Sequence, residues 1–380
     1  MKVFDYQTLN GLKLTTKMIE KLNLICELKG KTDHISLSAK DIMDKLLVVA
    51  KIESTDSSNR IEGITTSDAR LKKLMKQKTT PKNRSEEEIS GYRDVLAIIH
   101  DNYKYIKITP NNILTLHKQL FNFTESSWGG QFKDIDNAII TTFADGHKET
   151  RFTPPPAYIT PELVQSLCET YNNAICDNSL PPLILAAAFM LDFVSIHPFR
   201  DGNGRMSRLL MLLELQQLGF GVGKYISLER LIEKTKAQYY RTLLESSGKA
   251  WINNENDYGP YVDYFLSIVL QAYRELDSRI DITSNTEKDP ESLLLSKIIN
   301  SLKPLSRQEL MNLVPQYGES TIKHALARLR KEGKIGLVGK GKASRYIANN
   351  YSNVRIKRVI PDIITDDLFL KTTSLLKLTK

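Results

Sequence analysis

The longest apolar stretch of the chain is Leu183–Ile196, which is broken by the charged residue Asp192. It falls short of the roughly 20 apolar residues that a helix needs to cross a bilayer, so it predicts a buried helix in a folded domain. The opening residues, in which Asp5 closely follows Lys2, contain no apolar segment typical of a secretory signal. We therefore expect a cytoplasmic protein with no membrane partner.

The 380 residues are 41% hydrophobic and 26% charged, which is the balance of a globular chain, and the length favours two or more domains. The net charge of +9 is unevenly spread. Residues 291–380 hold 17 Lys and Arg against 7 Asp and Glu, whereas the first 290 residues hold 36 against 37. The basic C-terminal part is the natural candidate for contact with a polyanion.

Apolar residues at helical spacing predict a mainly α-helical chain. The expected helices are Leu12–Leu28, Ile42–Ile52, Glu87–Ile99, a helix after Pro110, Pro161–Tyr171, Leu183–Ile196 and Met206–Leu218. Between Trp128 and Pro156, β-forming residues on both sides of Asp145-Gly146 predict a single β-hairpin. The three cysteines, Cys26, Cys168 and Cys176, lack the spacing of metal ligands and are expected to be reduced thiols in the core.

The polar segment Asp281–Pro290 has the composition of a linker. Three expected helices follow, at Leu293–Leu302, Ser306–Val314 and Ser320–Lys331, and then two short strands on either side of a Gly-Lys-Gly-Lys tip. This order predicts a small α/β winged-helix domain. Its third helix and its wing carry the basic residues Lys323, Arg328, Arg330, Lys331, Lys340, Lys342 and Arg345. They suit the phosphates of duplex DNA, and a basic surface without a nucleic-acid partner is the alternative.

The segment His197–Arg208 lies between two strongly apolar helices and has the composition of an anion site. Gly202 and Gly204 allow a ligand to approach the backbone closely, and Asn203 is a favourable residue for beginning a helix. Free backbone N–H groups at a helix start bind anions. The sequence therefore predicts a phosphate site at the start of the second helix.

Four charged or titratable side chains flank that helix start. Arg205 and Arg208 are three residues apart and project from one face, Asp201 suits a Mg²⁺ ion between phosphates, and His197 titrates near neutrality and can accept a proton. Taken singly, each has an ordinary structural interpretation: a capping histidine, a charge at a helix start, an exposed ion-pair face. Their combination within twelve residues favours a functional site.

The segment resembles the His-Pro-Phe-x-(Asp/Glu)-Gly-Asn-Gly-Arg-x-x-Arg signature of Fic-domain proteins and matches every fixed position, and the similarity extends from roughly Pro110 to Tyr273. The resemblance implies a Fic-type helical core that transfers AMP from ATP to a protein hydroxyl. It implies that His197 is the base and that Asp201 binds Mg²⁺. It also implies that Gly202, Asn203 and Gly204 hold phosphate oxygens, with Arg205 at the β-phosphate and Arg208 at the γ-phosphate.

In this family the hairpin is a flap that holds the target segment, which here would be Lys133–Phe152. A purely structural hairpin is the alternative, because the strand after Asp136 departs from the commoner family pattern. The resemblance also makes Tyr240 an adenine contact, although Thr235 stands where the family usually has Asn.

A second motif, Ser58-Asn59-Arg60-Ile61-Glu62-Gly63, resembles the (Ser/Thr)-x-x-x-Glu-(Gly/Asn) inhibitory helix of Fic proteins. On its own it is a helical turn that ends in Gly63. Beside the Fic signature it implies that Ser58 and Glu62 inhibit the enzyme, with the Glu62 carboxylate bound to Arg208 in place of the γ-phosphate.

We expect an N-terminal helical region (1–109) with the inhibitory motif, a Fic core (110–278), a linker (279–292), a winged helix (293–350) and a tail (351–380). The expected activity is transfer of AMP to Ser, Thr or Tyr of a target protein or of the chain itself. One alternative is a Fic-type phosphotransferase, which Gly204 disfavours because such relatives have Lys there. The other is a DNA-binding regulator whose Fic core senses nucleotide.

Overall fold

The computed structural model describes residues 3–9, 11–36, 40–142, 146–251, 256–284, 289–299, 301, 304–315, 317–339, 341 and 344–349. The chain forms two compact units. The first comprises the chain up to Ile139 together with Thr150–Arg274, and the second comprises Ile140–Glu149 and the chain from Glu275 onwards. The division passes through the hairpin and through the long helix α11, so each unit is described by itself.

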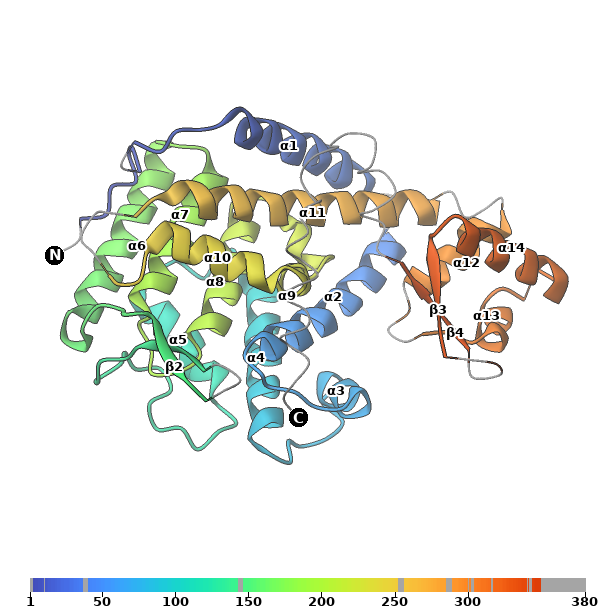
Figure 1. The fold of residues 1–380 in the computed structure, drawn as a ribbon, viewed down its shortest axis with the longest axis horizontal. Coiled ribbons are helices and arrows are strands. Elements are labelled where there is room, and N and C mark those ends of the chain that lie inside the picture. Colours follow the sequence, from blue (N-terminus) through green and yellow to red (C-terminus); the bar gives the residue numbers. More distant parts are fainter. Residues whose placement is uncertain are drawn as a thin grey trace. The chain divides into compact units, whose positions relative to one another are not determined.

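The first unit is almost entirely helical (Figure 1). Its helices are α1 (Thr16–Ser36), α2 (Lys40–Ile61), α3 (Asp68–Met75), α4 (Arg84–Asn102), α5 (Pro110–Leu120), α6 (Thr160–Asp177), α7 (Pro182–Ile196), α8 (Asn203–Gln217), α9 (Leu228–Lys234), α10 (Lys236–Ser247) and the greater part of α11 (Tyr258–Ser284). Two 3₁₀ turns, η1 (Ala157–Ile159) and η2 (Gly221–Lys224), join some of them. The expected hairpin is present as strands β1 (Ile139–Thr142) and β2 (Lys148–Phe152). Phe143, which was expected in the first strand, and Asp145, which was expected in the turn, lie outside the described residues.

Helices α7 and α8 form the centre of the first unit. Nearly every residue of both is buried, α6 and α8 pack on α7, and α4 packs on α8 (Figure 1). A helix that is apolar on all sides is stable only when other helices surround it. The Asp192 side chain within α7 is fully buried and accepts hydrogen bonds from the hydroxyl groups of Tyr6 and Tyr258.

Local sequence explains where the surrounding helices begin. Asn83 caps α4 by accepting a hydrogen bond from the backbone N–H of Glu86, and Thr109 caps α5, in which Pro110 occupies the first turn. A capping side chain satisfies a backbone donor that has no partner within the helix, and proline lacks that donor altogether.

The region before Pro110 belongs to the same compact unit as the segment that follows it. Helix α4, which precedes Pro110, packs on α2, α5 and α8. Residue 109, the expected boundary, therefore lies inside one compact unit. Helix α2 continues to Ile61, well beyond the end that the apolar spacing predicts. The sequence analysis missed α3, a short helix held by buried Leu71 and Leu74.

The second unit contains α12 (Pro290–Ile299), α13 (Arg307–Leu313), α14 (Glu319–Lys331) and the antiparallel strands β3 (Ile335–Val338) and β4 (Arg345–Ala348). These are the three helices and the hairpin that the sequence predicts there. The core of this unit is the buried set Leu294, Leu295, Ile298, Leu305, Leu310, Val314, Ile322, Ala325, Leu326, Leu329 and Ile335. Ser306 and Glu309 form a reciprocal capping box at the start of α13.

Helix α11 continues to Ser284, so the first residues of the expected linker are helical. Lys340, Lys342 and the tail 351–380 lie outside the described residues. The mainly α-helical class with small antiparallel hairpins is confirmed. In the described part of the chain, no helix combines the length and the apolar character that crossing a bilayer requires.

Candidate active site

The signature segment forms a tight loop between α7 and α8. Helix α7 ends at Ile196, and the next residue, His197, has a left-handed backbone with φ of 49°. Gly202, with φ of 81°, immediately precedes α8. A Cβ atom on Gly202 would lie 2.8 Å from the Phe121 ring, so only glycine fits there. The first backbone N–H groups of α8 have no partner within the helix, a geometry that suits an anion.

The Glu62 carboxylate lies over that end of α8. Its Oε1 atom accepts a hydrogen bond from Nη2 of Arg208 at 2.7 Å, and a Cβ atom on Gly204 would collide with it. Arg208 is 2% exposed and also donates to Ser58, from Nε to the hydroxyl at 2.8 Å and from Nη2 to the carbonyl at 2.9 Å. The structure thus brings Ser58 and Glu62 onto Arg208 within one chain.

Two contacts fix the backbone on either side of Glu62 and so hold its side chain in position. Gly63, with φ of 80°, ends the turn that follows α2, and Nζ of Lys236 donates to the Ile61 carbonyl at 2.6 Å. Burial raises the pKa of the Glu62 carboxyl, but the charges of Arg208, Arg205 and Lys236 outweigh burial and hold that pKa below its usual value. Glu62 is therefore a carboxylate at neutral pH.

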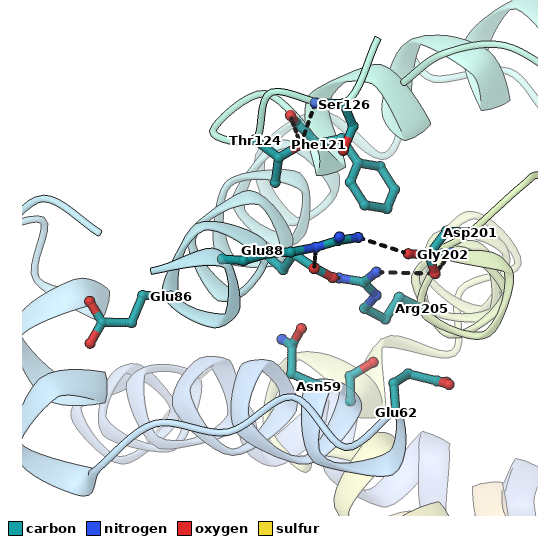
Figure 2. Close-up of polar contacts among 12 residues, drawn as sticks. Asn59, Glu62, Glu86, Glu88, Phe121, Thr124, Ser126, Asp201, Gly202 and Arg205 are labelled. Carbon is teal, nitrogen blue, oxygen red and sulfur yellow. Dashed lines mark hydrogen bonds and ion pairs between the residues drawn. The ribbon is translucent and has the colours of Figure 1, made fainter. Parts of the chain in front are cut away.

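Arg205 is engaged by a second acidic residue. Its Nη1 atom lies 2.7 Å from Oε2 of Glu88, and its Nη2 atom lies 3.8 Å from Asp201 (Figure 2). Glu88 also accepts from Arg84, whose exposed guanidinium reaches to 3.6 Å from Asp201. Both Arg205 and Glu88 are buried, so they form an ion pair whose disruption is costly. Sequence reasoning missed Glu88 and Arg84, because no motif links α4 to α8.

The Asn203 side chain is already engaged within the signature loop. Its side-chain oxygen accepts from the Phe199 N–H at 2.9 Å, and its side-chain nitrogen donates to the Phe199 carbonyl at 2.8 Å. Both polar atoms are used to close the loop, so a phosphate here would meet the backbone N–H of Asn203 and not its amide group.

His117 on α5 holds the same loop from another side. Its Nδ1 atom accepts from the Gly130 N–H at 2.9 Å, so Nε2 carries the proton and donates to the Asp201 carbonyl at 3.1 Å. The imidazole stacks on the Phe199 ring at 3.7 Å. Burial lowers the pKa of His117 to about 4, which keeps the ring neutral. No sequence signal pointed to this histidine.

His197 does not titrate near neutrality as the sequence analysis expected. Burial first, and then the charge of Lys133, lower its pKa to about 4, against smaller opposing effects of the Val194 carbonyl, Glu62 and Asp201. The imidazole is therefore neutral at pH 7 and able to accept a proton.

Asp201 and Tyr240 lie at the two edges of the site. The Asp201 side chain is 45% exposed and accepts from the Gly202 N–H at 2.6 Å. Within the residues that the structure describes, no three acidic, histidine or cysteine side chains gather as metal ligands. Mg²⁺ commonly takes one or two carboxylates together with substrate phosphates, so Asp201 alone fits such an ion.

The Arg151 guanidinium covers the Tyr240 ring at 4.0 Å, where a nucleobase would otherwise stack.

The comparisons with known proteins agree with this geometry. Residues 107–215, from the start of α5 through most of α8, match the Fic/DOC family. This part of the chain is therefore similar to a Fic domain.

Two similar curated proteins are named protein adenylyltransferase Fic. The one from Drosophila grimshawi is 29% identical over 191 residues, which cover 48% of this chain and 35% of that protein. The one from Drosophila mojavensis is 30% identical over 189 residues, which cover 48% and 33%. The match spans about a third of the length of these relatives.

Solved structures show the same fold. A Fic family protein from Desulfovibrio desulfuricans has a TM-score of 0.58 at 20% identity and covers 89% of this chain and 97% of its own. Residues 134–508 of Fic-1 from C. elegans have a TM-score of 0.55 at 19% identity and cover 70% and 73%.

Proposed function

We propose that this protein is an adenylyltransferase that moves AMP from ATP to a hydroxyl group of a protein. The observation that carries the proposal is the folded signature loop, in which a neutral His197 follows the last residue of α7 and the start of α8 comes six residues later, at Asn203. A base, an anion site and a buried arginine converge there, as transfer of a nucleotidyl group requires.

In the proposed reaction, the oxygen of a Ser, Thr or Tyr side chain attacks the α-phosphorus of ATP. His197 takes the hydroxyl proton, the bond from the α-phosphorus to the bridging oxygen breaks, and pyrophosphate leaves. The backbone N–H groups of Asn203 and Gly204 bind phosphate oxygens, and Arg208 binds the γ-phosphate. Mg²⁺ held by Asp201 would offset the negative charge of the phosphates.

The ion pairs of the site support autoinhibition as part of the proposal. Glu62 occupies Arg208 and lies against Gly204, so the γ-phosphate cannot take its place beside Arg208 while this contact persists. ATP bound with a displaced γ-phosphate leaves its α-phosphorus out of line with the incoming hydroxyl. Orientation accounts for roughly 7 kcal/mol or more of a barrier in favourable systems, so misalignment suppresses transfer.

ATP labelled at the α- or the γ-phosphate tests the reaction type. We expect the Glu62→Gly variant with Mg²⁺ to label itself or a protein in a lysate from α-labelled ATP and not from γ-labelled ATP, because the AMP part is transferred. Labelled protein is separated on a denaturing gel and mapped to the acceptor residue. Label from γ-labelled ATP alone would establish phosphate transfer instead.

A second proposed function is DNA binding by the second unit. Helix α14 exposes Lys323, Arg330 and Lys331, whereas Arg328 pairs with Glu291 at 3.2 Å. Exposed cations on one helix suit DNA phosphates, and each phosphate contact adds about one to the slope of log affinity against log salt.

We expect the full chain to shift genomic duplex fragments at low salt and to release them as salt rises. The double variant Lys323→Ala with Arg330→Ala is expected to lower the salt slope by about two, and Lys107→Ala, which removes an exposed cation from the first unit, is the matched control. If no fragment shifts at any salt concentration, the unit is better explained as a protein-interaction module.

A further inference from the structure

The backbone of His197 is in a conformation that a residue with a side chain seldom adopts. Its φ of 49° lies in the left-handed region, which is unfavourable for a residue other than glycine. Its own N–H still donates to the Phe193 carbonyl at 3.1 Å. The direction of the imidazole depends on the two peptide units beside it, so whatever holds those peptides also aims the base.

Lys133 contacts the peptide unit before His197 and the one that follows Pro198. Its backbone N–H donates to the Pro198 carbonyl at 2.9 Å, and its Nζ atom donates to the Ile196 carbonyl at 3.2 Å. Nζ also donates to the side-chain oxygen of Asn137 at 2.9 Å, and the nitrogen of that amide donates to the Phe199 carbonyl at 3.2 Å. Three carbonyls around His197 are thus held by one segment that leads into β1.

The Lys133 side chain is an unusual choice for a purely structural contact. It is 4% exposed, and among the ion pairs of the described residues none joins it to a carboxylate. A buried ammonium with no carboxylate in direct contact is costly, and burial lowers the pKa of Lys133 to about 8 against a smaller opposing effect of the Asp136 charge. An apolar residue would fill the space without that cost, but it would neither bind the Ile196 carbonyl nor place a positive charge near the imidazole.

We propose that Lys133 is a positioning residue for the base, which fixes the direction of the His197 imidazole through the Ile196 and Pro198 carbonyls. The inference rests on the proposed transfer reaction. Lys133 touches neither ATP nor the target hydroxyl; it acts through His197. Lys133 is the first residue of the segment that is expected to be the flap. It therefore links the start of that segment to His197, the proton acceptor.

The charged groups that face His197 agree with this role. Lys133 disfavours the imidazolium, whereas Glu62 and Asp201 favour it. Loss of the Lys133 charge is therefore expected to raise the pKa of His197, while loss of the hydrogen bond to the Ile196 carbonyl lets the ring turn away. Both effects act on the proton-transfer step and neither acts on the binding of phosphates.

The test compares Lys133→Met, Lys133→Arg and the matched control Lys107→Met, which changes an exposed lysine, all in the Glu62→Gly chain. We expect Lys133→Met to lower kcat for automodification by roughly tenfold to a hundredfold, because small errors of orientation are costly. The KM for ATP and the Kd of ATP from calorimetry are expected to stay within about twofold of those of the parent. Lys133→Arg retains a cation and is expected to restore part of the rate.

An NMR titration of His197 provides a readout that does not depend on activity. We expect the pKa of its imidazole to rise toward 6.5 in Lys133→Met and to stay low in Lys133→Arg and in the control. An unchanged kcat with an unchanged His197 titration in Lys133→Met would overturn the inference, as would a loss of ATP affinity equal to the loss of kcat. If the Glu62→Gly parent transfers no AMP, the proposed function fails, and the titration alone decides whether Lys133 holds His197.

Discussion

Replacing Glu62 with glycine is expected to raise AMP transfer by at least tenfold at saturating ATP. The substitution frees Arg208 from the carboxylate at 2.7 Å and clears the space against Gly204, so the γ-phosphate can bind and the α-phosphorus can align. Removing one partner of a buried ion pair usually costs stability or activity. Here Arg208 keeps its two hydrogen bonds to Ser58, so we expect the fold to remain intact.

Labelling with α-labelled ATP measures this effect, and thermal unfolding checks the fold. Glu125→Gly, which removes an exposed loop glutamate, is the matched control and is expected to behave like the wild type. The double variant Glu62→Gly with His197→Ala separates release of inhibition from chemistry, since it retains the cleared site but lacks the base. Equal labelling by the wild type and Glu62→Gly would rule out autoinhibition by this residue.

Replacing His197 with alanine in the Glu62→Gly chain is expected to reduce the rate by about 10²–10⁴-fold, which is the usual contribution of a general base. Binding of ATP is expected to persist, because phosphate contacts come from α8 and not from the imidazole. Full labelling by the double variant would show that another group removes the proton.

The pH dependence of the Glu62→Gly chain provides an independent check on His197. Its pKa of about 4 means that the ring loses its capacity to accept a proton only when the pH falls to about that value. The negative charge of Glu62 raises the pKa of His197, so its removal shifts that pKa further downward and not toward 6.5. We expect a rate that is level from pH 7 to about pH 5. An acid limb centred near pH 6.5 would contradict burial as the control of this histidine.

Much of the active site could be predicted from the sequence because its parts are close together along the chain. The apolar helices α7 and α8 and the polar loop between them are local patterns, and Gly202 adopts the positive φ that its lack of a side chain permits. The motif at Ser58 and Glu62 is also local, and the structure places both residues on Arg208.

Other parts of the site depend on packing between distant segments. Glu88 reaches Arg205, His117 holds the Asp201 carbonyl and Lys133 holds the peptides around His197, although 63 to 117 residues separate the partners in these contacts. No periodicity or spacing encodes such pairs, because their distances are set by how α4, α5 and the segment before β1 lie against the central helices.

The pKa of His197 could not be predicted from the sequence because it depends on burial. The residue type alone gives His197 a pKa near 6.5, whereas the apolar surroundings and the cation of Lys133 lower that pKa to about 4. The amino-acid sequence by itself determined the groups of the signature loop and of the motif at Ser58 and Glu62, because each set is contiguous along the chain. Only the tertiary structure decided which carboxylate faces which arginine and which groups carry charge, because both depend on distance and on exclusion of water.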